Sequence, residues 1–313
     1  MTATSDGATS KPAALVPVTI IGGYLGAGKT TLINALLAAD HGRRLAVLVN
    51  DFGAVNIDVE LIERHDGETI SLTNGCICCS IADSLGESLD QVLTLEPRPD
   101  QIVIEASGVA DPAAIAGYGQ GWPGCRLDAV VVLVDAEAIR RQARDQFVGE
   151  LVTRQLTRGD LVLLTKTDLM PEGAVRAVVD WVGAATSSPV VVLGEAMIEA
   201  AVVLDIKATS AESAAAPLAA HELFESAVLE PEGPLLRSSI ENALETWPKE
   251  IVRVKGVVSI VDAAGAVESH VVHRVGLRWS IEATQVAPVE RSHLVAIGLI
   301  GAVDAAELLR SLT

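Results

Sequence analysis

Four residues near the amino terminus have the types and spacing of a phosphate-binding loop. Gly23 is followed after four residues by Gly28, Lys29 and Thr30, which matches the Walker A pattern at every defined position. An apolar run typical of a strand precedes this segment, and a pattern typical of a helix follows it. Because a phosphate-binding loop joins a strand to a helix, the residues and their surroundings together predict a nucleotide site.

The chemistry of such a loop follows from its residue types. Glycines let the backbone wrap a phosphate with its N–H groups, and the amino terminus of the following helix adds positive potential. We expect Lys29 to reach the β- and γ-phosphates and the Thr30 hydroxyl to coordinate Mg²⁺. The predicted nucleotide contacts of this segment are Gly23, Gly26, Ala27, Gly28, Lys29, Thr30 and Thr31.

A second segment, Thr165-Lys166-Thr167-Asp168, follows an apolar run far downstream and indicates which base is bound. Asp168 can accept hydrogen bonds from N1–H and N2–H₂ of guanine, a pair that adenine does not offer. The stem of Lys166 can lie along the plane of the base. We therefore predict that the nucleotide is GTP or GDP, with a simple surface turn as the alternative interpretation.

Glu105 and Gly108 stand at the end of another apolar run, in the segment Ile104-Glu105-Ala106-Ser107-Gly108. A carboxylate at the end of a strand can hold the water shell of Mg²⁺. The N–H of Gly108 can bond a γ-phosphate and so distinguish GTP from GDP. An ordinary strand end is the alternative.

Three thiols lie within four residues in the segment Gly75-Cys76-Ile77-Cys78-Cys79. Thiolate ligands favour zinc, copper(I) or iron over magnesium, and three sulfurs leave one tetrahedral position open for metal exchange. Redox chemistry and buried structural cysteines are the alternatives. Asp51, after the second predicted strand, is a candidate fourth ligand. The isolated Cys125 is predicted to be a small, partly buried hydrophobic residue.

The composition limits the class of protein. The chain has 313 residues, half of them hydrophobic and 3% aromatic, with a formal net charge of −18. Such a charge argues against nucleic acid or an anionic membrane as a partner. No apolar stretch approaches the roughly 18 residues that a membrane span needs. Residues 1–14 are expected to be a disordered leader rather than a signal peptide, so we expect a cytoplasmic protein with reduced thiols.

Apolar runs alternate with helical patterns through the first two hundred residues, which predicts an α/β fold. The runs are short and rich in Val, Ile or Leu, as expected for a doubly wound, mostly parallel sheet of the P-loop NTPase type. The predicted strands are Val18–Ile21, Leu45–Asn50, Gln101–Glu105, Ala129–Val134, Leu161–Leu164 and Val190–Leu193. The predicted helices are Thr30–Ala39, Ser80–Leu95, Ala136–Leu156 and Glu172–Val182.

The chain is expected to contain a second, smaller domain. We assign residues 15–200 to the P-loop domain, 201–232 to a linker rich in Ala, Ser and Glu, and 233–313 to an α+β domain. His270 and His273 are three apart on a predicted strand, which places them on opposite faces in structural roles. The predicted elements are helices Leu235–Leu244 and Val303–Leu312 and strands Val252–Val261, Val271–Val275, Leu277–Ala283 and Leu294–Gly298.

These motifs together resemble those of the CobW-type metallochaperone GTPases, whose relatives include the urease and hydrogenase nickel-insertion proteins. The resemblance covers nearly the whole chain. Besides the phosphate-binding loop and the thiol block, it includes Asn50–Asp58, Ile104–Pro112, Leu127–Ala136 and Gln155–Asp168, and in the C-terminal domain Arg253-Val254-Lys255-Gly256 and Arg291–Gly298.

The resemblance implies GTP hydrolysis coupled to delivery or withholding of a transition metal, most often zinc or cobalt. It implies that the thiol block lies between two switch regions, so that the nucleotide can alter metal affinity. It also makes Asp58 an acidic switch residue that positions water or Mg²⁺. On this basis the predicted catalytic residues are Lys29, Glu105 and Asp58.

Three features of this chain depart from the family pattern. The family usually has Asn where this chain has Thr165, next to the base. It usually has Glu where this chain has Asp51, whose shorter side chain shortens any metal contact there. Many members carry a histidine-rich run between the domains, whereas Glu195–Glu232 contains only His221. A large capacity to buffer metal is therefore not expected.

Three functions compete on these observations. The leading hypothesis is a slow GTPase that transfers zinc or cobalt to a metal-dependent client protein. The second is a metal-sensing binding module that uses GTP as a structural clamp with little turnover. The third is a small-molecule kinase, which would require an arginine-rich lid that the sequence does not show. A homodimer is left open as the assembly.

Overall fold

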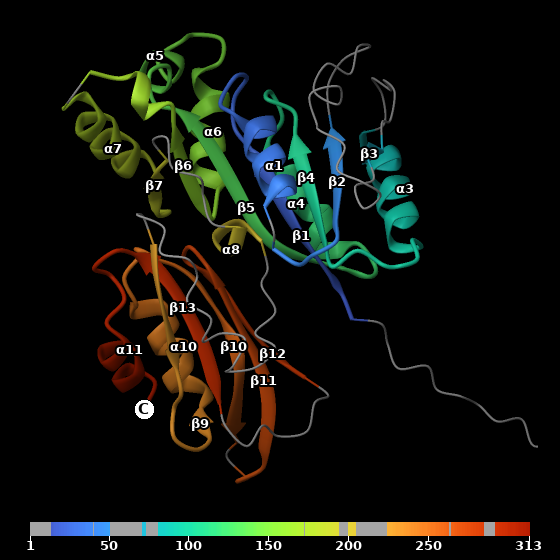
Figure 1. Cartoon of the computed structure of the whole chain (residues 1–313), viewed down its shortest axis with the longest axis vertical. Coiled ribbons are helices and arrows are strands. Elements are labelled where there is room, and N and C mark those ends of the chain that lie inside the picture. Colours follow the sequence, from blue (N-terminus) through green and yellow to red (C-terminus); the bar gives the residue numbers. More distant parts are fainter. Residues whose placement is uncertain are drawn as a thin grey trace, which may run out of the picture.

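Seven parallel strands form the first sheet. They are β1 (Val16–Gly22), β2 (Leu45–Asn50), β3 (Ser71–Leu72), β4 (Gln101–Ala106), β5 (Cys125–Asp135), β6 (Leu161–Thr165) and β7 (Val190–Val192). Their spatial order is β3-β2-β4-β1-β5-β6-β7 (Figure 1). The computed structural model describes residues 14–39, 41–50, 71–72, 81–171, 173–193, 200–204, 224–262, 264–284 and 292–313.

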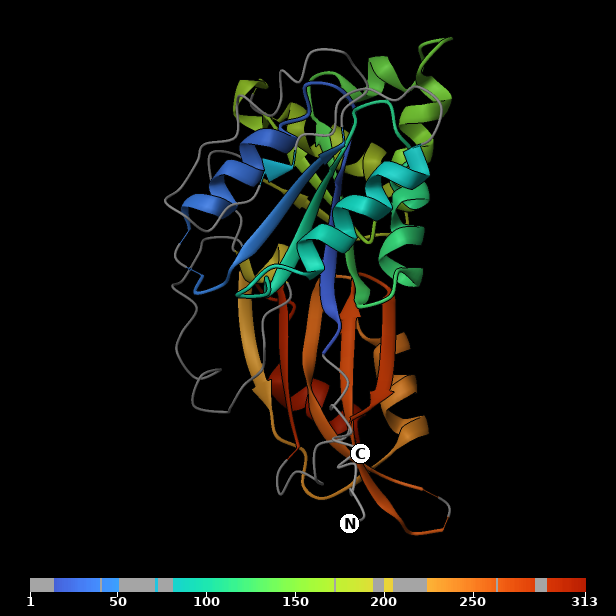
Figure 2. The same cartoon turned by 90° about the vertical axis from the view of Figure 1, so that its right-hand side faces the viewer.

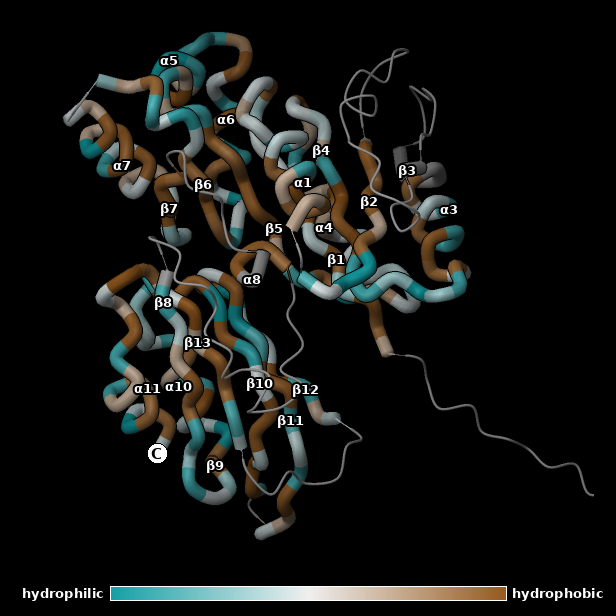
Figure 3. The backbone as a smooth tube through the Cα atoms, viewed as in Figure 1, coloured by the Kyte–Doolittle hydropathy of each residue, from teal (hydrophilic) through white to brown (hydrophobic). Residues whose placement is uncertain are grey.

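Burial on both faces explains the composition of these strands. Every residue of β1 and β4, at the centre of the sheet, is buried. The hydropathy colouring shows the same apolar character along the central strands (Figure 3). The structure confirms the six predicted strands and the α/β class. The sequence does not predict β3, because two residues leave no recognisable apolar run.

Helices cover both faces of this sheet (Figure 2). Residues of α3, α4, α6 and α7 share a core on one face, and those of α1 and α8 share a core on the other. The helices are α1 (Lys29–Ala38), α3 (Ile81–Leu93), α4 (Pro112–Gly121), α5 (Ile139–Gln142), α6 (Gly149–Arg158), α7 (Ala174–Ala185) and α8 (Ala200–Val203). The sheet is therefore doubly wound, as expected.

One helix prediction is wrong and one helix was not predicted. A single helix over Ala136–Leu156 is replaced by the separate helices α5 and α6. The Asp145 carboxylate accepts hydrogen bonds from the backbone N–H groups of Phe147 and Val148, which stabilises a turn between them. The additional helix is α4, where Asp111 caps the amino terminus and Pro112 occupies the first turn.

The second sheet has six strands and is mostly antiparallel. The strands are β8 (Phe224–Leu229), β9 (Leu235–Leu236), β10 (Ile251–Val261), β11 (Val267–Val275), β12 (Arg278–Ala283) and β13 (His293–Leu299). The order is β12-β11-β10-β13-β8, with β9 paired to β10. Helices α10 (Arg237–Thr246) and α11 (Ala305–Ser311) pack on one face. The predicted strands and helices of this region are confirmed, except that Leu235–Leu236, predicted as the start of a helix, form β9. The strand β8, before residue 233, is also additional to the prediction.

The register of β10 and β11 confirms the predicted orientation of two histidines. His270 pairs with Val258 and His273 pairs with Lys255, so the two imidazoles lie on opposite faces of the sheet. Val258 belongs to the core beneath α10 and α11. His273 therefore points to the face that meets the first sheet.

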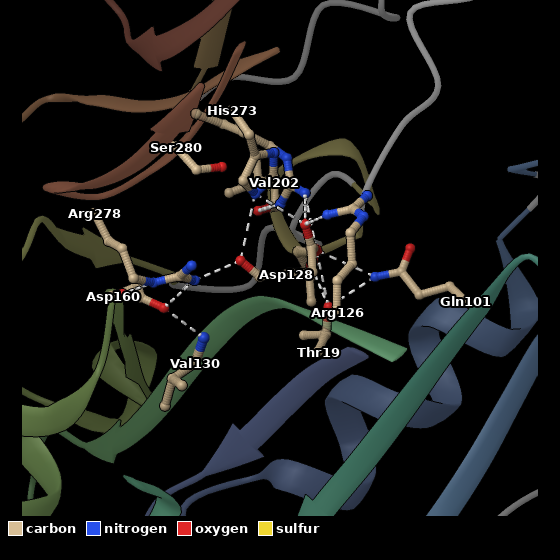
Figure 4. Close-up of polar contacts among 12 residues, drawn as sticks. Thr19, Gln101, Arg126, Asp128, Val130, Asp160, Val202, His273, Arg278 and Ser280 are labelled. Atoms are coloured by element: carbon tan, nitrogen blue, oxygen red, sulfur yellow. Dashed lines mark hydrogen bonds and ion pairs between the residues drawn. The ribbon is translucent and has the colours of Figure 1, made fainter. Parts of the chain in front are cut away.

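The second sheet contacts the amino-terminal edge of the first, away from the carboxyl ends of its strands (Figure 1). Val252, Val275 and Ile297 join the core that contains α1 and α8. Beside this apolar contact lies a buried polar network (Figure 4). The two domains are thus joined by both apolar and charged groups.

Asp128, at the start of β5, is the centre of that network and is 0% exposed. The Arg253 guanidinium donates to both of its carboxylate oxygens at 2.7 and 2.9 Å, and His273 Nε2 lies 3.2 Å from Oδ1. Burial alone would raise the pKa of Asp128, but Arg253 and His273 outweigh burial and hold the pKa well below its usual range.

A second ion pair flanks the first. Arg278, at the start of β12, donates to Asp160 at 2.8 and 2.9 Å and to the Asp128 backbone carbonyl at 2.5 Å. Burial would lower the pKa of Arg278, but the hydrogen bonds and negative charge of Asp160 raise it.

None of the helices in the described ranges combines the length and the apolar character that a membrane span requires.

Candidate functional site

The glycine loop between β1 and α1 lies at the carboxyl edge of the first sheet. Gly23, Gly26 and Gly28 have φ values of 128°, 76° and 95°, a region that glycine enters without strain. At Gly23 a Cβ atom would lie 2.3 Å from the carbonyl oxygen of Leu133 in β5. The loop is therefore able to run close against the neighbouring strand only because this residue is glycine.

Helix α1 begins directly after the loop. Gly28 is its capping residue and supplies no side-chain hydrogen bond, and the positive end of the helix dipole favours an anion at this end. Lys29, the first helical residue, is buried, whereas Thr31 is exposed. This is the arrangement of a loop and helix end that can surround phosphate oxygens.

Thr30 and Glu105 come together from two different elements. The Thr30 hydroxyl lies 3.1 and 3.4 Å from the two carboxylate oxygens of Glu105, near the end of β4. Glu105 is only 3% exposed. A hydroxyl and a buried carboxylate are hard oxygen ligands, so this pair fits Mg²⁺.

The backbone after β4 lies against the glycine loop. A Cβ atom at Gly108 would lie 2.5 Å from the Leu25 side chain and 2.8 Å from the Leu25 backbone nitrogen. On its other side, the Gln155 amide in α6 donates to the carbonyl oxygens of Gly108 and Ala110, at 3.2 and 2.8 Å. Sequence reasoning placed Gly108 at the site but gave no role to Gln155.

The segment after β6 is held to the same loop by Thr165. Its hydroxyl lies 2.9 Å from the carbonyl oxygen of Ala27 and 3.1 Å from that of Val134. The Thr165 side chain thus occupies the junction of the glycine loop with β5 and β6.

Lys166 has a left-handed backbone, with φ of 58°, the one such non-glycine residue among those described. Its Nζ atom lies 2.8 Å from Asp135 at the end of β5. The other Asp135 oxygen accepts from the backbone N–H groups of Glu137 and Ala138. Asp168 lies in a short 3₁₀ turn, Thr167–Leu169, and is exposed, which leaves its carboxylate available to a base.

Several predicted site residues lie outside the described residues: Asp51, Asp58, Cys76, Cys78 and Cys79. In the parts of the chain that are described, no group of three or more His, Cys, Asp or Glu residues could hold a metal ion. Cys125 is buried, as predicted, and burial raises the pKa of its thiol to about 11.

A parallel sheet wound on both faces, with a glycine loop before its first helix and a hydroxyl–carboxylate pair beside it, defines a P-loop nucleotide-binding protein. Residues 17–191 match the family model described as CobW/HypB/UreG, nucleotide-binding domain, and residues 224–313 match the cobalamin synthesis protein CobW C-terminal domain. The first match alone covers more than half of the chain. This protein therefore belongs to the CobW family.

Curated relatives are similar over about half of the chain. A zinc chaperone CobW from Sinorhizobium sp is 38% identical over 202 residues, which cover 55% of this chain and 56% of the relative. The zinc chaperone YjiA of Escherichia coli is 39% identical over 165 residues, which cover 50% and 51%. The chain thus spans about half the length of the curated relatives it matches.

Two solved structures show a more distant similarity to this chain. The Zn(II)-bound YjiA GTPase from E. coli is 23% identical, with a TM-score of 0.45 over 96% of this chain and 98% of that one. A nickel complex of HypB from Helicobacter pylori is 16% identical, with a TM-score of 0.39 over 57% and 79%.

Proposed function

We propose that this protein hydrolyses GTP and uses the nucleotide to control transfer of a transition metal, preferably zinc, to a client protein in the cytoplasm. The pairing of Thr30 with Glu105 beside the glycine loop is the observation that best supports the nucleotide half. The hydroxyl and the carboxylate are groups suited to Mg²⁺, and they lie at the start of α1, the end of a helix that favours an anion.

In the proposed reaction, residues of the chain bind and orient the triphosphate. Lys29 neutralises charge on the β- and γ-phosphates, and the Gly108 N–H bonds the γ-phosphate. Thr30 and Glu105 would hold Mg²⁺, which would supply positive charge to the triphosphate. We assign the orientation of the attacking water to Asp58, and recognition of guanine to Lys166 and Asp168.

The thiol block is the proposed site of the transferred metal. Cys76, Cys78 and Cys79 offer three soft ligands, with Asp51 as a candidate fourth. Zinc is favoured over cobalt because two curated relatives carry the name zinc chaperone. Because the block follows one switch region and precedes another in the proposed arrangement, loss of the γ-phosphate is expected to change its metal affinity.

Metal affinity measured with two nucleotides tests the proposal. The full chain is titrated with zinc and with cobalt(II), first with GDP and then with GMPPNP. A thiolate-to-cobalt charge-transfer band whose strength or affinity changes with the nucleotide supports a gated metallochaperone. Metal binding that is indifferent to the nucleotide favours a metal-sensing module clamped by GTP.

Variants separate the metal site from the rest of the molecule. Joint replacement of Cys76, Cys78 and Cys79 by Ser should abolish tight metal binding. The matched control Cys125→Ala should retain it, because that thiol is buried and does not belong to the motif. Unchanged metal stoichiometry in the triple variant would contradict the metal half, and negligible GTP turnover with metal present would contradict the catalytic half.

A further inference from the structure

The segment between β4 and α4, residues 107–111, is enclosed on two sides by other elements of the candidate site. The glycine loop packs on one side of it and helix α6 on the other. We propose that Gln155 of α6 is a positioning residue that fixes the direction of the Gly108 N–H and so sets the preference for GTP over GDP. This inference rests on the proposed function, because it assigns Gly108 to the γ-phosphate.

Three hydrogen bonds fix successive peptide groups of this segment. The Ser107 carbonyl accepts from the Ala110 N–H at 2.9 Å. The Gln155 amide then donates to the carbonyls of Gly108 and Ala110. An amide nitrogen carries two hydrogens, so one side chain can satisfy both carbonyls together.

Peptide planarity converts these contacts into a direction for the Gly108 N–H. In a trans peptide, the C=O and N–H groups point in opposite directions. Because the Ser107 carbonyl is turned into the loop toward Ala110, the Gly108 N–H of the same peptide points out of it. Rotation of this peptide alone breaks the bond between Ser107 and Ala110, and rotation together with the following peptides also breaks the bonds to Gln155 in α6.

The position of Gln155 in its helix argues for a purpose beyond covering the core. It is 2% exposed and lies among the buried residues of α6 with Val152 and Leu156. A polar side chain on an apolar face is unfavourable unless its donors are bonded. Here both donors are bonded to the one segment that is expected to sense the γ-phosphate.

Gly108 itself leaves no room for adjustment on the opposite side. Any side chain there would collide with Leu25, a residue of the glycine loop. Movement of the segment away from α6 is therefore opposed by the glycine loop, and movement away from the glycine loop is opposed by Gln155. The pair of contacts ties the sensing N–H to the phosphate-binding backbone.

Replacement of Gln155 without changing its size tests the idea. Gln155→Met removes both donors, and Gln155→Glu replaces them with an oxygen that faces two carbonyls. The matched control is Gln146→Glu, the same chemical change at an exposed residue. Turnover of GTP, affinity for GDP and affinity for GMPPNP are measured with Mg²⁺, together with the melting temperature.

A positioning role predicts a loss specific to the triphosphate. Both variants should lower kcat and weaken GMPPNP binding by roughly tenfold, while GDP affinity changes by less than about twofold. Equal weakening of GDP and GMPPNP would mean that Gln155 is merely structural and would overturn the proposal, as would values equal to those of Gln146→Glu.

The proposed function is tested separately by the unmodified protein. If it binds GMPPNP but shows no turnover, the catalytic half fails, and Gln155 is still judged by GMPPNP against GDP. If the unmodified protein does not distinguish the two nucleotides at all, the assignment of Gly108 fails and this inference fails with it.

Discussion

At the scale of single residues, the segment after β6, to which we assign recognition of the base, is joined to the glycine loop by one hydroxyl. Thr165 stands where the family usually has Asn, yet its hydroxyl contacts the carbonyl oxygens of Ala27 and Val134. A threonine hydroxyl can donate only one hydrogen at a time, so it links the glycine loop to β6 by one bond shared between two acceptors. Thr165 therefore bonds the glycine loop with a side chain that is shorter than that of Asn.

Thr165→Val removes that hydroxyl at nearly constant volume. We expect a loss of about 1 kcal/mol in guanine nucleotide binding, or roughly fivefold in Kd, because a loop carbonyl loses its donor. Thr165→Asn should bind close to the unmodified protein, since an amide can donate in its place. Calorimetric titration with GDP measures this, with the exposed Thr157→Val as control. An unchanged affinity in Thr165→Val would show that the contact does not support the site.

A residue of the candidate site could be predicted from sequence when a short contiguous motif carries its chemistry. Lys29, Thr30 and Glu105 could be proposed from sequence because short contiguous motifs carry their chemistry. Gln155 acts on carbonyls that are 45 and 47 positions away, and no local pattern encodes such a contact. The sequence signal for Gln155 was weak, because it is only a polar residue next to Leu156 on the buried face of an amphipathic helix.

At the scale of elements, the strands of the first sheet other than β3 were predictable because most of them are short apolar runs buried on both faces. The break between α5 and α6 was not, because residues 136–156 have no proline and their polarity suits one long helix. The turn depends on the Asp145 side chain bonding to two backbone N–H groups, and Asp in a helical pattern is common. Local side-chain bonding outweighed helix propensity there.

Gly23, at the junction of β1 and the glycine loop, allows a specific prediction. Gly23→Ala would place a Cβ atom 2.3 Å from the Leu133 carbonyl at a φ of 128°, so the loop must move away from β5. We expect a loss of about 1–3 kcal/mol of unfolding free energy in the absence of nucleotide. Thermal and urea unfolding measure it.

Gly26→Ala is the matched comparison. Gly26 also has a positive φ, of 76°, but a Cβ atom there would meet nothing within 4 Å. Its cost should be limited to the left-handed backbone, about 1 kcal/mol. If Gly26→Ala is as destabilising as Gly23→Ala, close approach to β5 is not what requires glycine at position 23.

At the scale of the whole molecule, the nucleotide edge and the domain interface lie at opposite ends of β5. Asp135 stands at one end and Asp128 at the other. The charge partners of Asp128 described above, Arg253 and His273, both come from the second sheet. The first domain therefore carries a buried carboxylate that is stabilised by the second, and we expect the two to unfold together.

Lowering the pH should show how far the unfolding free energy depends on the charge of Asp128. The pKa of Asp128 is lowered in the folded state, so its contribution to stability is present above the unfolded pKa, near 4, and is lost as pH falls through the folded value. The unfolding free energy should therefore fall more steeply below about pH 4 in the unmodified protein than in Asp128→Asn. Urea unfolding between about pH 2.5 and 6 measures both slopes. Parallel slopes would mean that Asp128 is not held as an anion.

Removal of Arg253 gives the strongest test of the interface. Arg253→Met leaves the buried carboxylate without its main partner, which should cost about 3–5 kcal/mol of unfolding free energy. Combining it with Asp128→Asn should cost less than the sum of the two single changes, because the uncompensated charge is gone. Arg176→Met, which breaks an exposed pair with Asp180, should cost less than about 0.5 kcal/mol.

Chemical denaturation of these four variants and the unmodified protein shows whether charged or apolar contacts hold the two domains together. If the charged network holds the domains, Arg253→Met unfolds at lower denaturant or in two transitions, and the double variant recovers part of the loss. If Arg253→Met is no worse than Arg176→Met, the apolar contacts of Val252, Val275 and Ile297 are sufficient to join the domains. Strict additivity of the two interface variants would likewise contradict a direct interaction between Asp128 and Arg253.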